Sequence, residues 1–170
     1  MKLLELLPSI LSGLRIVLAL ALFYTYLSEM MLPSIIIFII AISTDYVDGF
    51  IARKFDFTTN YGAFLDSAAD FILITIIFLA FIISGIYPFW ILILIMFMFI
   101  QFILTSGTKK PIYDPIGKYY GAFLFFTAGI TIIFPFILPT GYVTNTLLIL
   151  IVLFSSISLL TRFYSLYKKN

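Results

Sequence analysis

The sequence contains no cysteine and no histidine. Without cysteine, the chain forms no disulfide and offers no thiolate for catalysis or metal binding. Without histidine, it lacks the most common general base and the most common ligand of catalytic zinc. Any catalysis by this chain must therefore use carboxylates, lysine, arginine, tyrosine or hydroxyl groups.

Charge is also scarce, because only 11% of the 170 residues are charged whereas 63% are hydrophobic, and the mean hydropathy is +1.19. A soluble domain of this composition would not stay dispersed in water. The composition therefore indicates an integral membrane protein whose main solvent is lipid. The length suits one compact helical bundle, so we expect residues 1–170 to form a single catalytic domain.

Long apolar runs predict the fold class. A membrane-spanning helix needs about 20 mostly apolar residues, and six segments meet this length within tolerance. The runs lack the alternation of a β-barrel, so we predict an all-α polytopic membrane protein with six transmembrane helices. The expected spans cover residues 9–27, 33–53, 60–84, 88–105, 116–138 and 142–167.

The basic residues predict how the chain is oriented. If the N-terminus is cytoplasmic, all ten lysines and arginines fall on or near the cytoplasmic side, and the external turns hold only Glu29. This distribution predicts an even number of spans with both termini in the cytoplasm. Residues 1–12 have apolar positions at helical spacing, which fits either a short amphipathic helix or the beginning of the first span. Several tyrosines near predicted helix ends fit an interfacial aromatic belt: Tyr113, Tyr119, Tyr120, Tyr142, Tyr164 and Tyr167.

Four aspartates lie inside the second and third predicted spans. A charged side chain at the centre of a bilayer costs about 2.5–3.5 kcal/mol on insertion scales, so four of one sign require a cause. Asp45 and Asp48 are three residues apart and Asp66 and Asp70 are four apart, so each pair shares one helix face. If the two faces meet, the carboxylates form a site for Mg²⁺ or Mn²⁺, since these cations prefer oxygen ligands.

Other residues on these faces fit a phosphate-containing ligand. Gly49, Ala52 and Gly62 are small enough to let a ligand approach the backbone, and Arg53 supplies a cation suited to phosphate. A purely structural alternative is that the aspartates pair with basic side chains such as Arg15 or line water at a helix end. Too few basic residues lie at matching depth for that alternative to explain all four carboxylates.

The segment from Asp45 to Asp70 resembles the signature of the CDP-alcohol phosphotransferases, D-x2-D-G-x2-A-R-x8-G-x3-D-x3-D, with every fixed position present. An earlier segment containing Pro8, Ser12 and Arg15 is similar to the N-terminal P-N-x-x-T-x-x-R motif of that family, although Ser12 stands where threonine is usual. The resemblance covers the first 70 residues well.

The resemblance implies a membrane enzyme of phospholipid biosynthesis that transfers a phosphatidyl-type group from a CDP-linked lipid to an alcohol and releases CMP. It also implies two Mg²⁺ or Mn²⁺ ions, an active site on the cytoplasmic side of the cell membrane, and often a homodimer. The implied metal ligands are Asp45, Asp48, Asp66 and Asp70, of which Asp70 is also the catalytic general base. The implied CDP-binding residues are Asp48, Gly49, Ala52, Arg53, Gly62 and Asp66.

The identity of the acceptor stays open at this stage. Four basic residues on the side of the carboxylates favour a phosphorylated acceptor such as glycerol phosphate or inositol phosphate; these candidates are Lys109, Lys110, Lys118 and Arg162. Positive-inside bias explains the same placement without a ligand, which leaves serine or another non-phosphorylated alcohol as the alternative. A divalent-cation transporter would require acidic residues toward both faces, and no nucleic-acid partner is expected.

Overall fold

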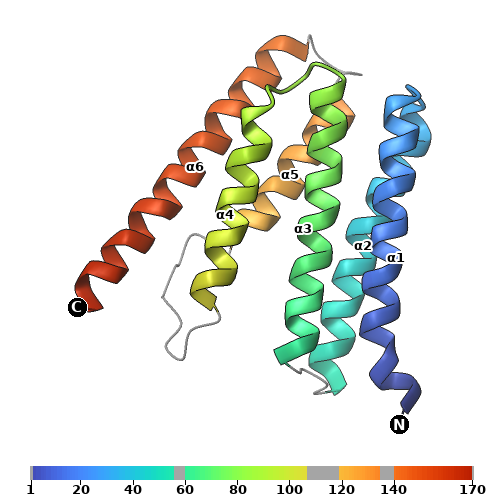
Figure 1. The fold of residues 1–170 in the computed structure, drawn as a ribbon. Coiled ribbons are helices and arrows are strands. Elements are labelled where there is room, and N and C mark those ends of the chain that lie inside the picture. Colours follow the sequence, from blue (N-terminus) through green and yellow to red (C-terminus); the bar gives the residue numbers. More distant parts are fainter. Residues whose placement is uncertain (1, 56–59, 107–118, 135–139, 170) are drawn as a thin grey trace. The chain divides into compact units, whose positions relative to one another are not determined.

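The computed structural model describes the backbone of residues 2–55, 60–106, 119–134 and 140–169, and side chains within 13–44, 68–102, 119–134 and much of 141–167. The described residues form six helices (Figure 1), and the predicted all-α class is confirmed. These helices are α1 (Lys2–Leu27), α2 (Met31–Phe55), α3 (Asn60–Ile83), α4 (Trp90–Ser106), α5 (Tyr120–Ile133) and α6 (Thr140–Lys169). Each expected span overlaps one helix, although residues 116–118 and 135–138 of the fifth span lie outside the described residues. Residues 2–12 continue into α1 without a break.

A tight turn reverses the chain between α1 and α2. Glu29 adopts the left-handed conformation with φ 58°, and the Met30 amide donates to the Thr25 carbonyl at 2.9 Å. The fully buried hydroxyl of Ser34 lies within hydrogen-bond distance of the Met30 carbonyl, at 2.9 Å, and of the Thr25 hydroxyl, at 3.1 Å. Because these polar groups satisfy one another, Ser34 can be buried beneath a turn whose residues 28–30 are exposed.

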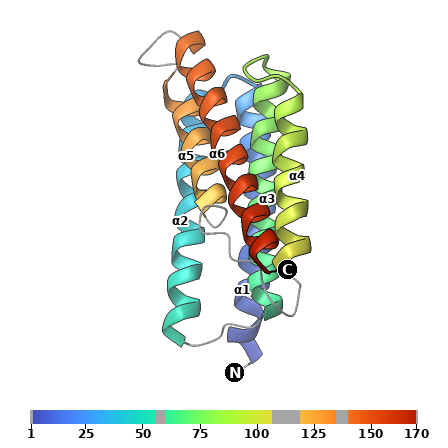
Figure 2. The ribbon, with the colours of Figure 1, turned by 90° about the vertical axis from the view of Figure 1, so that its left-hand side faces the viewer.

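The chain divides into two compact units, Met1–Ser84 and Gly85–Asn170, and each is described by itself. In the first unit, α1 packs against both α2 and α3, as Figures 1 and 2 show from two directions. The buried face of α1 carries Ala19, Leu22 and Tyr26, which recur at helical spacing. The Tyr26 ring meets the edge of Phe81 on α3, with ring centroids 5.0 Å apart.

In the second unit, α5 packs against α6 through aromatic and hydroxyl groups. The rings of Phe123 and Phe154 stack with centroids 4.6 Å apart. Beside them, the buried hydroxyls of Tyr120 and Ser155 are hydrogen-bonded at 2.9 Å. The expectation that Tyr120 belongs to an interfacial belt is therefore wrong, because its hydroxyl finds a partner inside the unit rather than at the membrane surface.

A second tyrosine fixes the segment between α3 and α4. Tyr87 is only 3% exposed, and its hydroxyl is hydrogen-bonded to the Thr131 hydroxyl of α5 at 2.9 Å. The Thr131 hydroxyl also donates to the Thr127 carbonyl at 2.8 Å, so it accepts from Tyr87. Burial raises the pKa of Tyr87 above 10.0, which keeps the phenol protonated as a donor.

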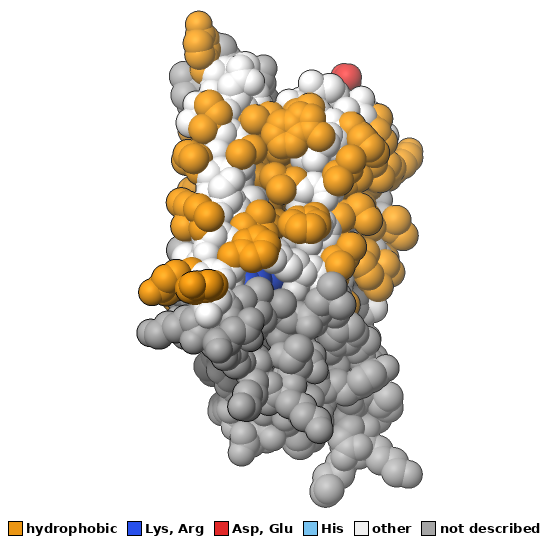
Figure 3. Space-filling model, turned by 60° about the vertical axis from the view of Figure 1, so that its left-hand side comes forward, with side chains coloured by type: hydrophobic (Ala, Val, Ile, Leu, Met, Phe, Trp, Pro, Cys, Tyr) orange, Lys and Arg blue, Asp and Glu red, His pale blue; other side chains and the backbone are white. Residues whose placement is uncertain are grey.

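The described residues include one helical segment that is long and apolar enough to cross a membrane. It covers Gly141–Tyr164 of α6, has a mean hydropathy of 2.2, and is only 22% buried. Shorter apolar stretches of 10–17 residues occur in the other five helices. Large apolar side chains are exposed on all six helices, including Leu20, Leu32, Ile83, Ile93, Phe126 and Leu160, and hydrophobic groups dominate the described face in Figure 3. This surface is unsuited to water, while the number and orientation of the spans stay predictions.

Candidate active site

The aspartate pattern lies on two helices of the first unit. Asp45 and Asp48 belong to α2, and Asp66 and Asp70 belong to α3, and both helices run through these positions without interruption. The helical spacing on which the predicted site depends is therefore present in the backbone. The side chains of residues 45–67 lie outside the described part of the structure. Convergence of the aspartates, and the roles of Gly49, Ala52, Arg53 and Gly62, consequently stay predictions.

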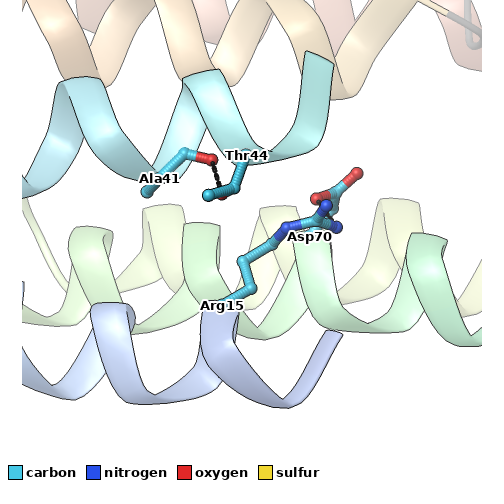
Figure 4. Close-up of polar contacts among 4 residues, drawn as sticks. All are labelled: Arg15, Ala41, Thr44 and Asp70. Atoms are coloured by element: carbon cyan, nitrogen blue, oxygen red, sulfur yellow. Dashed lines mark hydrogen bonds and ion pairs between the residues drawn. The ribbon is translucent and has the colours of Figure 1, made fainter. Parts of the chain in front are cut away.

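Asp70 is the one signature residue whose side chain the structure describes. Its carboxylate Oδ1 accepts a hydrogen bond from Nη1 of Arg15 at 2.6 Å, which is also an ion pair. Figure 4 shows the guanidinium of Arg15, from α1, meeting Asp70, from α3, near Thr44 of α2. A bond this short between charged groups is among the stronger hydrogen bonds in proteins. Asp70 is thus held by a cation from a different helix.

The two partners differ in exposure. The side chain of Arg15 is 0% exposed and that of Asp70 is 28% exposed. The side chain of Arg15 is therefore fully enclosed by the protein, whereas part of the Asp70 side chain is accessible. Such partial access is what a carboxylate needs if it is to meet a metal ion or a substrate hydroxyl as well as its internal partner.

The register of α1 against α3 explains why these two residues meet. Arg15 and Asp70 are 55 residues apart, and so are Tyr26 and Phe81. The second pair lies eleven residues beyond the first on both helices, which is about three turns or roughly 16 Å along the axis. Helices α1 and α3 therefore run parallel in fixed register, with an ion pair and an aromatic pair along one seam.

Arg15 was expected in the N-terminal motif and as one possible partner of the aspartates, but its pairing with Asp70 in particular was not predicted. No local pattern in the sequence indicates this pairing, because it depends on how α1 packs against α3. Pro8 and Ser12, the other residues of the motif, lie outside the described side chains.

The donor set suits a hard divalent cation. Four carboxylates supply only oxygen ligands, the type that Mg²⁺ and Mn²⁺ prefer, and Asp70 combines such oxygens with partial exposure. Among the side chains that the structure describes, no three acidic residues come together. The side chains of Asp45, Asp48 and Asp66 lie outside that described part, so the metal ligands stay a prediction from the signature and its helical spacing.

The acceptor-phosphate candidates lie in the second unit. Lys109, Lys110 and Lys118 are outside the described residues. Arg162 lies on α6, where it is 4% exposed and shares a helix face with the buried hydroxyls of Ser155 and Ser158. A buried guanidinium among hydroxyl groups is chemically suited to an anion, and its use for an acceptor stays a prediction.

Comparison with known families agrees with the signature. The chain belongs to the CDP-alcohol phosphatidyltransferase family, whose model matches residues 5–158. The match extends well beyond the signature and reaches into α6, so it includes residues of both units.

Individual relatives carry a more specific name. The chain is 44% identical over 96 residues to the CDP-diacylglycerol–glycerol-3-phosphate 3-phosphatidyltransferase of Wigglesworthia glossinidia brevipalpis, covering 56% of this chain and 52% of that protein. The enzyme of the same name from Bacillus subtilis is 42% identical over 64 residues, or 38% of this chain and 33% of that protein. The one from Haemophilus influenzae is 35% identical over 88 residues, or 52% and 47%. The chain thus matches about half or less of the length of these relatives.

Proposed function

We propose that this protein transfers the phosphatidyl group of CDP-diacylglycerol to glycerol 3-phosphate, forms phosphatidylglycerol phosphate and releases CMP. Family membership supports the reaction class, and the names of the relatives support both substrates. The observation that carries the proposal is the complete aspartate signature on two helices of one unit, with Asp70 held by a buried arginine.

In the proposed reaction, the hydroxyl oxygen of the acceptor attacks the β-phosphorus of the CDP-lipid. A new phosphorus–oxygen bond forms while the bond to the CMP oxygen breaks, and CMP leaves with the electron pair. Asp70 takes the proton of the attacking hydroxyl as general base.

Asp45, Asp48, Asp66 and Asp70 would hold the divalent cations. When bound, Mg²⁺ or Mn²⁺ would neutralise the pyrophosphate and make CMP a better leaving group. The small residues Gly49, Ala52 and Gly62 would let the CDP group approach the helix backbones, and Arg53 would bind a phosphate. These roles follow the family signature residue by residue.

A phosphorylated acceptor is proposed for two reasons. The relatives named above are described by their use of glycerol 3-phosphate. In addition, Arg162 is a buried cation on α6, and a guanidinium is a group that binds phosphate well. Lys109, Lys110 and Lys118 complete the candidate set. Serine is the alternative acceptor, and it would not need these cations.

The reaction requires a lipid environment because its donor and product both carry acyl chains. The composition and the exposed apolar side chains support six helices in the membrane with both termini and the active site on the cytoplasmic side. A homodimer is part of the proposal through the family resemblance alone.

Purified protein in detergent, supplied with CDP-diacylglycerol, Mg²⁺ and one acceptor at a time, tests the proposal. Glycerol 3-phosphate, inositol phosphate and serine form the acceptor panel, and the lipid product is identified by mass. We expect CMP release and phosphatidylglycerol phosphate only with glycerol 3-phosphate. Product with serine alone would overturn the proposed acceptor, and no CMP release with any acceptor would overturn the proposed reaction.

A further inference from the structure

Arg15 occupies a position where the pattern of α1 requires an apolar residue. It lies four, seven and eleven residues before Ala19, Leu22 and Tyr26, which are 0%, 2% and 6% exposed, and it is itself 0% exposed. All four residues therefore belong to one buried helix face. An arginine at such a position loses its hydration and must be compensated by specific partners.

Asp70 likewise lies on an apolar, buried face of its helix, α3. Asp70 lies four, seven and eleven residues before Ile74, Ile77 and Phe81, which are at most 4% exposed. The ion pair thus replaces one layer of apolar contact in the α1–α3 seam. Because apolar side chains of similar volume usually stabilise such a position as well as a buried ion pair does, packing alone gives no reason for the charges.

The geometry instead restricts the Asp70 carboxylate. A carboxylate on a helix can rotate about two side-chain bonds, and a bond of 2.6 Å to a fully enclosed guanidinium fixes the direction of Oδ1. The guanidinium is planar and rigid, and its own position is set by the packing of α1. The orientation of one reacting group is in this way determined by a helix that carries no residue of the aspartate signature.

We infer that Arg15 is a positioning residue, which holds the carboxylate of Asp70 in the orientation required for proton transfer from the acceptor hydroxyl. The inference rests on the proposed function, since it concerns how Asp70 performs its role as base. Misplacing a reacting group by about 1 Å commonly lowers a rate by roughly 100-fold. Loss of Arg15 therefore lowers the turnover number rather than the affinity for either substrate.

Steady-state kinetics of three variants test the inference. Arg15→Lys keeps the positive charge but loses the planar group, Arg15→Gln keeps a hydrogen-bond donor without charge, and Thr44→Val is the control. Thr44 is a suitable control because it lies near the ion pair in Figure 4 while its hydroxyl donates to the Ala41 carbonyl of its own helix at 2.8 Å. All rates are divided by the folded fraction, which size-exclusion chromatography in detergent measures.

We expect kcat to fall about tenfold in Arg15→Lys and about 100-fold in Arg15→Gln, with the KM values for CDP-diacylglycerol and glycerol 3-phosphate within twofold of the wild type. Thr44→Val should match the wild type in every constant. A role in stability alone predicts fewer folded molecules with an unchanged kcat. A direct role in binding a substrate phosphate predicts a raised KM for that substrate.

If the wild type is active, an unchanged kcat with fewer folded molecules would overturn the inference, and so would a raised KM for one substrate. Both results would leave the proposed function intact. Retention of about a tenth of the kcat by Arg15→Lys, with a larger loss in Arg15→Gln and unchanged KM values, would support the inference. A wild-type chain that releases no CMP would overturn the proposed function and the inference together, so the two failures are distinguishable.

Discussion

The ion pair between Arg15 and Asp70 makes a quantitative prediction for stability. A double-mutant cycle with Arg15→Met, Asp70→Asn and both substitutions isolates the energy with which the two residues interact. A hydrogen bond to a charged group contributes about 1.5–3 kcal/mol. Because Asp70 is 28% exposed, solvent screens part of this interaction. We therefore expect a coupling energy near the lower limit, about 1.5–2 kcal/mol, with the double variant more stable than the sum of the single changes predicts.

The assay is equilibrium unfolding in mixed detergent micelles, with a chelator present so that no metal binding contributes. Asp70→Asn combined with Tyr26→Leu is the matched control, because Tyr26 lies on the same seam about 16 Å from the ion pair. Effects at that separation should add within about 0.5 kcal/mol. If the Arg15–Asp70 cycle were equally additive, the two residues would not interact, and the reasoning about the seam would be wrong.

Four further predictions concern the metal site, Asp70, Lys118 and the α1–α3 seam. Chelation of divalent cations should abolish CMP release, and added Mg²⁺ or Mn²⁺ should restore it; full activity after chelation would contradict a carboxylate metal site. Asp70→Asn should reduce kcat at least 1,000-fold, about the upper part of the range for a general base, while the chain still elutes as a folded species; substantial residual CMP release would remove Asp70 from this role. Lys118→Ala should raise the KM for glycerol 3-phosphate about tenfold without changing that for the CDP-lipid, since one charged contact is lost; an unchanged acceptor KM would argue against the phosphate pocket. Phe81→Ala should destabilise the protein by about 3–5 kcal/mol, because Phe81 is 1% exposed in the α1–α3 seam, and a loss below about 1 kcal/mol in detergent unfolding would show that the seam is not packed as described.

The fold class and the helix positions were predictable from sequence because apolar runs interrupted by turn residues determine both. The expected third span, residues 60–84, differs from α3 (Asn60–Ile83) by a single residue at its end. Helix α5 (Tyr120–Ile133) lies within the expected fifth span, residues 116–138, whose outermost residues fall outside the described part of the chain.

The aspartate signature could also be recognised in the sequence, because its spacing alone places each pair of aspartates on one face of a helix.

Two other features could not be predicted from the sequence. The pairing of Arg15 with Asp70 depends on the register of α1 against α3, which no local pattern contains. The hydrogen bond between Tyr120 and Ser155 depends on how α5 packs on α6, and a tyrosine near a helix end is compatible with either an interface or a core.

Crystals grown with Mn²⁺ would locate the cations through their anomalous scattering. We predict that the strongest peaks lie between α2 and α3, within ligand distance of the carboxylate oxygens of Asp45, Asp48, Asp66 and Asp70. Peaks at other residues, or carboxylates of α2 and α3 too far apart to share a cation, would contradict the proposed site and with it the proposed reaction.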